Sequence, residues 1–280
     1  MRCWLLLDAA LLDERALRNV TAVIAMSSAL SGSPLVAYGS RAPRVALLPS
    51  DPDRAADIAK RLIALDPRAP AVSVLRSAST EDELIGLFAY LAQATVDGDL
   101  PVHCRFADSR VLPGLLPRLS PSQQARLTRA VSRWTWIDHL GQSASWQPPV
   151  AAEAVDADAE PHLKLSMSQV DAILAESEPD TIFALLLDTT PELVPDDRRG
   201  AFRDRLSRIL VSAATLSVEL PNDRLQYVIL ALGFGETFHQ EPELQSTWQA
   251  LARKQTTLQA AMQTWDDAFW DRLEARRAAR

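Results

Sequence analysis

The chain has 280 residues, of which 48% are hydrophobic and 23% are charged, and its net charge is -7. This composition is typical of a folded globular protein and excludes a disordered chain. The acidic balance argues against a nucleic-acid-binding protein, because such a surface needs a basic face.

The start of the chain, MRCWLLLDAALLDERA, begins like a signal peptide, but Asp8 interrupts its apolar run, and Asp13 and Glu14 follow at once. We therefore expect no signal peptide. No apolar run approaches the ~20 residues that a membrane-spanning helix needs. The only cysteines, Cys3 and Cys104, form no C-x-x-C pair, which favours a reducing compartment. These features predict a cytoplasmic protein that does not insert into a membrane.

Short apolar runs alternate with helical patterns in the first half of the chain. Residues 50–65 and 79–94 have apolar side chains at helical spacing behind Ser, Thr or Asp caps. The strand candidates are rich in Val, Leu and aromatic residues and lie at 3–9, 34–39, 44–49, 71–76, 101–106 and 133–140. This alternation predicts an α/β lobe over residues 1–147, with a mixed or mostly parallel sheet covered by helices.

A segment rich in Pro, Ala and acidic residues, 148–161, predicts an exposed linker. Residues 162–280 show helical patterns only, so we expect an all-α second lobe. Its end has heptad spacing and predicts one long C-terminal helix, whose stripe is Leu244, Trp248, Leu251, Gln255, Leu258, Met262, Trp265 and Phe269. We favour packing of this helix on its own lobe, and the alternative is that its aromatic end binds another protein.

The stretch HCRFADSR, residues 103–110, has the H-C-x5-R spacing of cysteine phosphatases. In such a site a thiolate lies at a strand end, and backbone N–H groups bind the phosphate. The residues between Cys104 and Arg110 include no Gly to let the loop curl around an anion, and Asp108 adds a negative charge. In the structural interpretation that we prefer, Asp108 caps the next helix, while Arg105 and Arg110 pair with carboxylates or helix-end carbonyls.

Other catalytic patterns are absent from the sequence. The four histidines have no metal-ligand spacing, and there is neither a G-x-S-x-G elbow nor a P-loop. GFGETF, residues 233–238, half resembles a dinucleotide loop but follows a predicted helix instead of a strand. We expect no catalytic residues, no metal and no cofactor, and thus a protein that is not an enzyme.

The order RFADSRVLPGLLPRLSPSQQARL followed by WTWIDHLG resembles the type VI secretion adaptor family, whose domain is known as domain of unknown function 4123. WLLLDAALL and SPLVAYGS fit the same layout, so the resemblance covers roughly residues 3–146. The family pattern is closer to Phe-Arg-Phe-Tyr-Asp-Pro-Arg. Here Cys104 precedes Arg105, Ala107 replaces the aromatic residue and Ser109 replaces Pro.

The resemblance implies a cytoplasmic chaperone that binds a cognate type VI effector and helps load it onto the valine–glycine-repeat spike protein. Nucleic acid is not an expected partner. Four residues match the family pattern, Arg105, Asp108, Arg110 and Leu112, and we take them as candidates for partner binding. Aromatic residues of the two lobes complete the candidate set, namely Trp134, Trp136, Trp248, Trp265 and Phe269. The alternatives are a cysteine-dependent phosphatase that uses Cys104 and Arg110, and a type VI immunity protein that neutralises a toxin by binding it.

Overall fold

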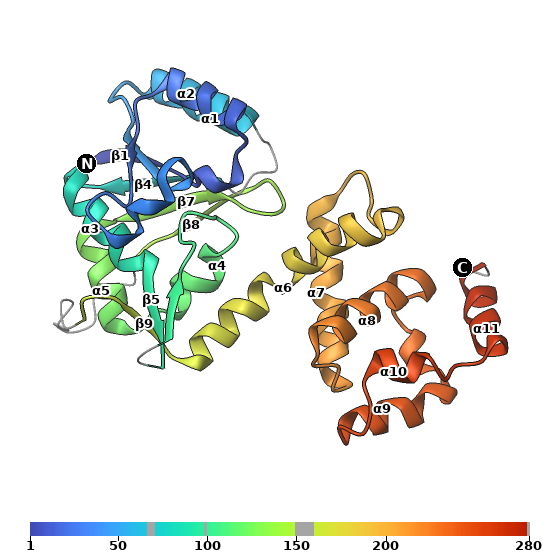
Figure 1. Cartoon of the computed structure of the whole chain (residues 1–280). Helices are drawn as coiled ribbons and strands as arrows, with labels where there is room; N and C mark the ends of the chain where they lie inside the picture. The colour runs from blue at the N-terminus through green and yellow to red at the C-terminus, as the bar shows by residue number, and fades with distance from the viewer. Residues whose placement is uncertain (66–70, 98–99, 149–159, 279–280) are drawn as a thin grey trace. The chain divides into compact units, whose positions relative to one another are not determined.

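The computed structural model describes residues 1–65, 71–97, 100–148 and 160–278, and the chain divides into two compact units, Met1–Ser177 and Glu178–Arg280 (Figure 1). The division falls inside α6 (Met167–Thr189) and not in the predicted linker 148–161. It falls later because β9 (Leu163–Leu165) and the first turns of α6 pack on the core of the first unit. Residues 149–159 of the predicted linker lie outside the described residues.

A six-stranded sheet with the order β2-β3-β1-β4-β7-β8 forms the centre of the first unit. Its strands are β1 (Arg2–Leu7), β2 (Ser27–Ser28), β3 (Arg44–Leu47), β4 (Val72–Ser77), β7 (Arg133–Ile137) and β8 (Ser143–Trp146). Helices α1 (Glu14–Val23) and α2 (Pro52–Leu65) lie on one side of this sheet, and α3 (Glu81–Ala92) and α5 (Pro121–Ala130) on the other (Figure 1). An α/β unit with covered sheet faces is therefore confirmed.

The prediction of a mixed or mostly parallel main sheet is wrong, because every pair of neighbouring strands in it is antiparallel. The strand–helix–strand unit β3-α2-β4 does exist, and β3 and β4 run in the same direction. However, β1 lies between them and is antiparallel to both. The connection from β3 through α2 to β4 leaves room for one strand between the two parallel strands. The order of strands and helices in a sequence does not show that β1 occupies this position.

The same unit contains a second sheet of three strands, ordered β6-β5-β9. Strand β5 (Gln93–Val96) pairs antiparallel with β6 (Leu100–His103) and parallel with β9. The segment 34–39, a strand candidate, is instead part of a 3-10 helix, η2 (Pro34–Arg41). This conformation is favoured because the Ser33 side chain accepts the N–H of Leu35 and Pro34 occupies the first helical position.

The main sheet separates two hydrophobic cores, and β1 supplies both of them. Trp4 and Leu6 point into the main core under α3 and α5, and Leu5 and Leu7 into the core under α1 and α2. All four side chains are at most 2% exposed. Shorter elements complete the unit: η1 (Ala9–Leu11), α4 (Leu112–Leu115) and η3 (Leu116–Arg118).

The second unit is helical, as predicted, and has one core. Its elements after α6 are η4 (Pro191–Leu193), α7 (Arg199–Thr215), α8 (Pro221–Phe234), η5 (Phe238–Gln240), η6 (Pro242–Leu244), α9 (Gln245–Ala252), α10 (Leu258–Met262) and α11 (Asp267–Ala278). Across the described residues of both units, no helix has the length and apolar character needed to cross a bilayer.

The predicted long C-terminal helix is wrong, because the heptad stripe 244–269 runs through η6, α9, α10 and α11 and the turns between them. Lys254 adopts a left-handed φ of 55° after α9, which ends that helix. Thr257 then caps α10 by accepting the N–H of Ala260, and Asp266 accepts the N–H of Phe269 at the start of α11. The regular stripe arises because three short helices each present one apolar face to the same core.

Two ion pairs join the C-terminal half of α6 to its own unit. Arg224 forms a bidentate pair with Glu178, in which the distance from Nη2 to Oε2 is 2.6 Å, and it also donates to the carbonyl oxygens of Val218 and Leu210. Arg203 pairs with Asp180 at 3.1 Å. The side chains of Arg224 and Glu178 are 15% and 25% exposed, so the pair is only partly screened by solvent.

We expect Glu178→Ala to lower the free energy of unfolding of the second unit by about 2 kcal/mol, because it leaves Arg224 without its anion. Urea unfolding followed by circular dichroism measures this change. The matched control is Glu219→Ala, which removes an exposed partner of Lys254 in the same unit and should cost less than about 0.5 kcal/mol. Equal effects of the two substitutions would contradict the prediction.

Candidate functional site

The candidate site begins where β6 ends and the chain turns towards α4. In this turn the N–H of Asp108 donates to the carbonyl of Arg105, and the N–H of Val111 donates to the carbonyl of Asp108. The Asp108 carboxylate accepts the backbone N–H of Arg110 at 3.1 Å. Because α4 starts only at Leu112, Asp108 stabilises the turn and is not the predicted helix cap.

Two buried carboxylates hold two arginine side chains in this turn. Arg110 binds Asp108 through two bonds, Nε to Oδ1 at 3.0 Å and Nη2 to Oδ2 at 2.7 Å. Arg105 donates from Nη2 to Asp8 Oδ2 at 3.0 Å, and the same nitrogen lies 3.5 Å from Asp108 Oδ2. Asp8 follows β1, and its other oxygen accepts the N–H of Ala10. The predicted pairing of Arg105 and Arg110 with carboxylates is therefore confirmed.

The cluster of Asp8, Arg105, Asp108 and Arg110 presents guanidinium groups on a fixed support. The two carboxylate side chains are 4% exposed, whereas Arg105 and Arg110 are 43% and 40% exposed. A guanidinium group that is already held by buried carboxylates loses little further side-chain entropy when it binds. This arrangement suits recognition of another polar surface.

The neighbouring Cys104 lacks the properties of a nucleophile. It packs against the main core, and burial raises the pKa of its thiol to about 12. A cysteine phosphatase needs a thiolate near neutral pH and an arginine that is available to phosphate. Here the thiol is protonated at neutral pH, and the arginine of the motif, Arg110, is bound by Asp108. Both groups of the H-C-x5-R motif are therefore unsuited to phosphatase chemistry.

Behind the turn, three predicted partner-binding residues are buried in the main core. Leu112 and Trp134 are fully buried, and Trp136 is 7% exposed. The indole N–H of Trp134 donates to Ser73 Oγ at 2.9 Å, and Phe88 contacts both Trp134 and Phe106. The alternation of β7 points both tryptophans between the sheet and its helices, so these residues pack in the core behind the turn and not on its surface.

In the second unit, the structure likewise buries Trp248 and Phe269 in the helical core. The indole N–H of Trp248 donates to the carbonyl of His239 at 2.8 Å. Trp265 is partly exposed, and its ring lies 5.1 Å from the rings of both Phe269 and Trp270. Of the aromatic candidates, only Trp265 therefore presents part of its ring to solvent.

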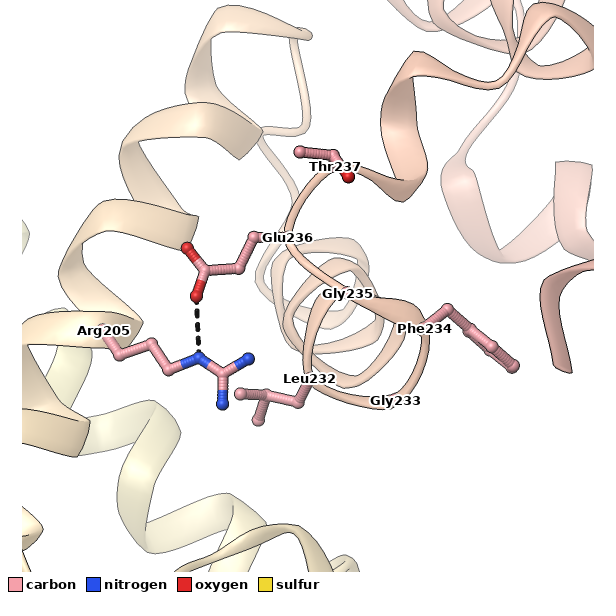
Figure 2. A pocket seen from close by; sticks show the side chains of 7 residues that line it. All are labelled: Arg205, Leu232, Gly233, Phe234, Gly235, Glu236 and Thr237. Atoms are coloured by element: carbon pink, nitrogen blue, oxygen red, sulfur yellow. Dashed lines mark hydrogen bonds and ion pairs between the residues drawn. The ribbon is translucent and has the colours of Figure 1, made fainter. Parts of the chain in front are cut away.

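A depression of about 540 Å³ lies in the second unit at the C-terminal end of α8. Figure 2 shows that Arg205 of α7 and Glu236 face each other beside it, with Nε to Oε1 at 2.8 Å, while Phe234 points away from this pair. Residues 233–237 of the segment GFGETF line it, and the segment begins in the last turn of helix α8, so it lacks the strand that a dinucleotide loop requires. Among the described residues, no group of three or more His, Cys, Asp or Glu side chains could hold a metal ion.

Part of the first unit is similar to a known protein family. Residues 3–126 match the family model described as Domain of unknown function (DUF4123). These residues form a DUF4123 domain. No curated protein and no solved structure matches the chain. The DUF4123 domain contains the whole cluster of Asp8, Arg105, Asp108 and Arg110, and it indicates an association with type VI secretion.

Two residues of the site in the DUF4123 domain, Asp8 and Tyr38, were not predicted from the sequence. Asp8 is the main partner of Arg105 but lies 97 residues away, so no local spacing reveals the pair. The only signal for Asp8 in the sequence is that it is an acidic residue directly after a strand whose two faces are both apolar. Tyr38 is 46% exposed, and its ring lies 5.1 Å from the ring of His103. The sequence predicted a strand over residues 34–39, whereas the 3-10 helix η2 places Tyr38 beside His103 of β6.

We expect Asp108→Ala to lower the free energy of unfolding of the first unit by about 2–3 kcal/mol, because both arginines lose a buried anion. Denaturant unfolding checks this value. The control is Asp57→Ala, which removes an exposed pair with Arg61 on α2 and should cost about 0.3–0.5 kcal/mol. A loss for Asp108→Ala as small as that of the control would contradict a stabilising role of the cluster.

We also expect the Cys104 thiol to react about 1,000-fold more slowly with iodoacetamide at pH 7 than an ordinary cysteine. A pKa of about 12, raised from 9.0 by burial, lowers the thiolate fraction by that factor. The measurement uses the Cys3→Ser variant, in which Cys104 is the remaining cysteine. The rate should still rise with pH up to pH 10. An inflection between pH 5 and pH 8 would show a reactive thiolate and would contradict the prediction.

Proposed function

We propose that this protein is a type VI secretion adaptor that binds one effector and helps load it onto the valine–glycine-repeat spike protein. The match of residues 3–126 to the DUF4123 family, whose members are known as effector chaperones or adaptors of this system, is the observation that supports this function best. In this proposal the protein works in the cytoplasm and is not an enzyme.

The chemistry of the candidate site agrees with binding better than with catalysis. The thiol at the start of the family-matched turn, Cys104, is protonated at neutral pH because burial raises its pKa to about 12. The arginines of the turn are held by two buried carboxylates, Asp108 in the turn and Asp8 after β1, and they remain partly exposed. Such a cluster keeps a surface rigid, which lowers the entropic cost of binding a protein.

An exposed aromatic surface lies close to this cluster. Tyr38 and Val36 of η2 are 46% and 57% exposed, and Tyr38 contacts His103 at the end of β6. Arg105 is close enough to His103 for its charge to lower the histidine's pKa, after the larger effect of burial. Tyrosine and arginine are enriched where proteins bind one another. We call Val36, Tyr38, His103 and Arg105 the Tyr38–Arg105 surface and propose it as an effector contact.

Deletion of the gene should abolish or strongly reduce secretion of the effector encoded next to it, while secretion of the spike protein itself continues. The physical reason is that an adaptor supplies a binding surface for one cargo and no part of the secretion apparatus. Immunoblots of culture supernatants measure both proteins, and expression of the gene in trans is the control. Unchanged effector secretion in the deletion strain would overturn the proposal.

Co-purification with the same effector then tests the proposed surface. The double variant Tyr38→Ala, Arg105→Ala should weaken the complex by at least about tenfold, because it removes two interface anchors. The matched control is Leu47→Ala, which truncates a side chain of similar exposure, 48%, on β3 of the same unit. If the control weakens the complex as much as the double variant, the Tyr38–Arg105 surface is not the contact.

A further inference from the structure

The two sheets of the first unit have four edge strands, and the exposed backbone of an edge strand can pair with another chain. The edges are β2 and β8 in the main sheet, and β6 and β9 in the small sheet. Natural proteins block such edges with proline, charge, short strands or a covering side chain. The question is which of these four edges is left open.

The hydrogen-bond pattern determines which backbone groups of β8 point outward. In an antiparallel pair, the backbone N–H and C=O groups of every second residue point towards the partner strand. The N–H of Leu48 donates to the carbonyl of Cys3, so the backbone groups of Cys3 point towards β3. Following the alternation from β1 through β4 to β7 places the N–H and C=O groups of Ala144 and Trp146 on the side of β7. The bond from the N–H of Asp138 to the carbonyl of Gln142, at 2.8 Å, gives the same result from the hairpin end. The N–H and C=O groups of Ser143 and Ser145 therefore point away from the sheet.

The other three edges each have a device that closes them. In β6, the bond from the N–H of Cys104 to Ala92 shows that position 101 faces outward, and Pro101 has no N–H there. In β9, the side-chain amide of Gln123 on α5 donates to the carbonyl of Lys164. Strand β2 has only two residues, and the carbonyl of Ser28 accepts the N–H and the hydroxyl of Ser31.

Strand β8 is also short, but it has no proline, no charge and no covering side chain in the part of the chain that the structure describes. Its four residues, SASW, include no proline and no charge. Within the same part of the chain, no hydrogen bond uses the outward N–H and C=O groups of Ser143 or Ser145. Both serine residues are exposed, and their outward backbone groups lie at the free edge of the sheet.

We propose that an extended segment of the effector pairs with β8 and adds a strand to the main sheet. This inference rests on the adaptor function proposed above and names the way in which the partner is held. The pleat of the sheet determines the chemistry of that segment. Residues of the effector segment that lie beside Ala144 and Trp146 are on the same face of the sheet as the half-buried Trp146, so they should be apolar. Residues that lie beside Ser143 and Ser145 are on the other face and should be polar. The partner is therefore a segment of alternating apolar and polar residues without proline at the paired positions.

A second copy of this chain is a poorer occupant of the same edge. The edge offers the outward N–H and C=O groups of Ser143 and Ser145 only, because β8 is four residues long. Pairing of two such edges buries far less than the ~1,200–2,000 Å² of a stable interface between proteins. An effector segment avoids this limit, because the effector also contacts the adaptor elsewhere, as on the proposed Tyr38–Arg105 surface.

The test compares Ser145→Pro with Ser145→Ala in the full chain, using the protein encoded next to this gene as the probe. Proline removes the outward N–H and leaves the bonds of Ala144 and Trp146 to β7 intact, while alanine keeps that N–H. We expect the Kd of the complex to rise at least about tenfold for Ser145→Pro and to stay within about twofold for Ser145→Ala. Circular dichroism and the melting temperature confirm that both variants fold.

Hydrogen–deuterium exchange provides a second measurement that needs no variant. In the wild-type chain, the amides of Ser143 and Ser145 should exchange rapidly when the chain is alone and at least about tenfold more slowly in the complex. Protection of these amides in the free chain at low concentration would show that the edge is already covered. Protection that grows with the concentration of the chain alone would assign the edge to a second copy. Either result would overturn the inference.

The outcomes separate this inference from the proposed function. If the effector binds wild-type chain and Ser145→Pro equally well, strand addition is overturned and the adaptor function stands. If the wild-type chain forms no complex with the probe, both are overturned. Loss of binding in Ser145→Pro alone, together with protection of the Ser145 amide in the complex, would support both.

Discussion

The first unit depends on one constraint, namely that β1 must bury both of its faces. Trp4 and Leu6 enter one core while Leu5 and Leu7 enter the other, so the strand occupies the middle of the sheet and helices cover both sides. A strand that is apolar on both faces cannot lie at an edge without exposing one of them. The end of β1 is thereby fixed as well, and with it the position of Asp8, on which the arginine cluster is built.

Much of the first unit could be predicted from the sequence, because caps and apolar periodicity are local. The helix that follows Thr80 and the strand 133–137 are found where the pattern indicates them. The direction of the strands could not be predicted, since the place of β1 between β3 and β4 is a tertiary choice. In the second unit, heptad spacing at 244–269 was misleading, because a stripe of apolar residues shows which face is buried but not whether the backbone is continuous.

The candidate site shows the same division between local and distant information. The sequence predicted that Arg105 and Arg110 pair with carboxylates or helix-end carbonyls, but it assigned Asp108 to a helix cap and not to these arginines. It could not identify Asp8, because that partner comes from another strand. The aromatic residues were chosen for their chemistry alone, and burial decides their role. Trp134 is a core residue because β7 lies inside the sheet and this side chain points into the main core. Tyr38 is exposed, but the prediction of a strand over 34–39 did not indicate this.

The outward proline of β6 has a consequence for where a second chain can pair with the first unit. Pro101 lies next to Leu100, which is 64% exposed, and the edge has no N–H to offer at position 101. A change of this codon to one for a β-branched residue would restore that N–H and give the small sheet an edge as open as that of β8. The unit would then present two places for an added strand instead of one. In the described part of the chain, Pro101 thus makes strand addition specific to the main sheet.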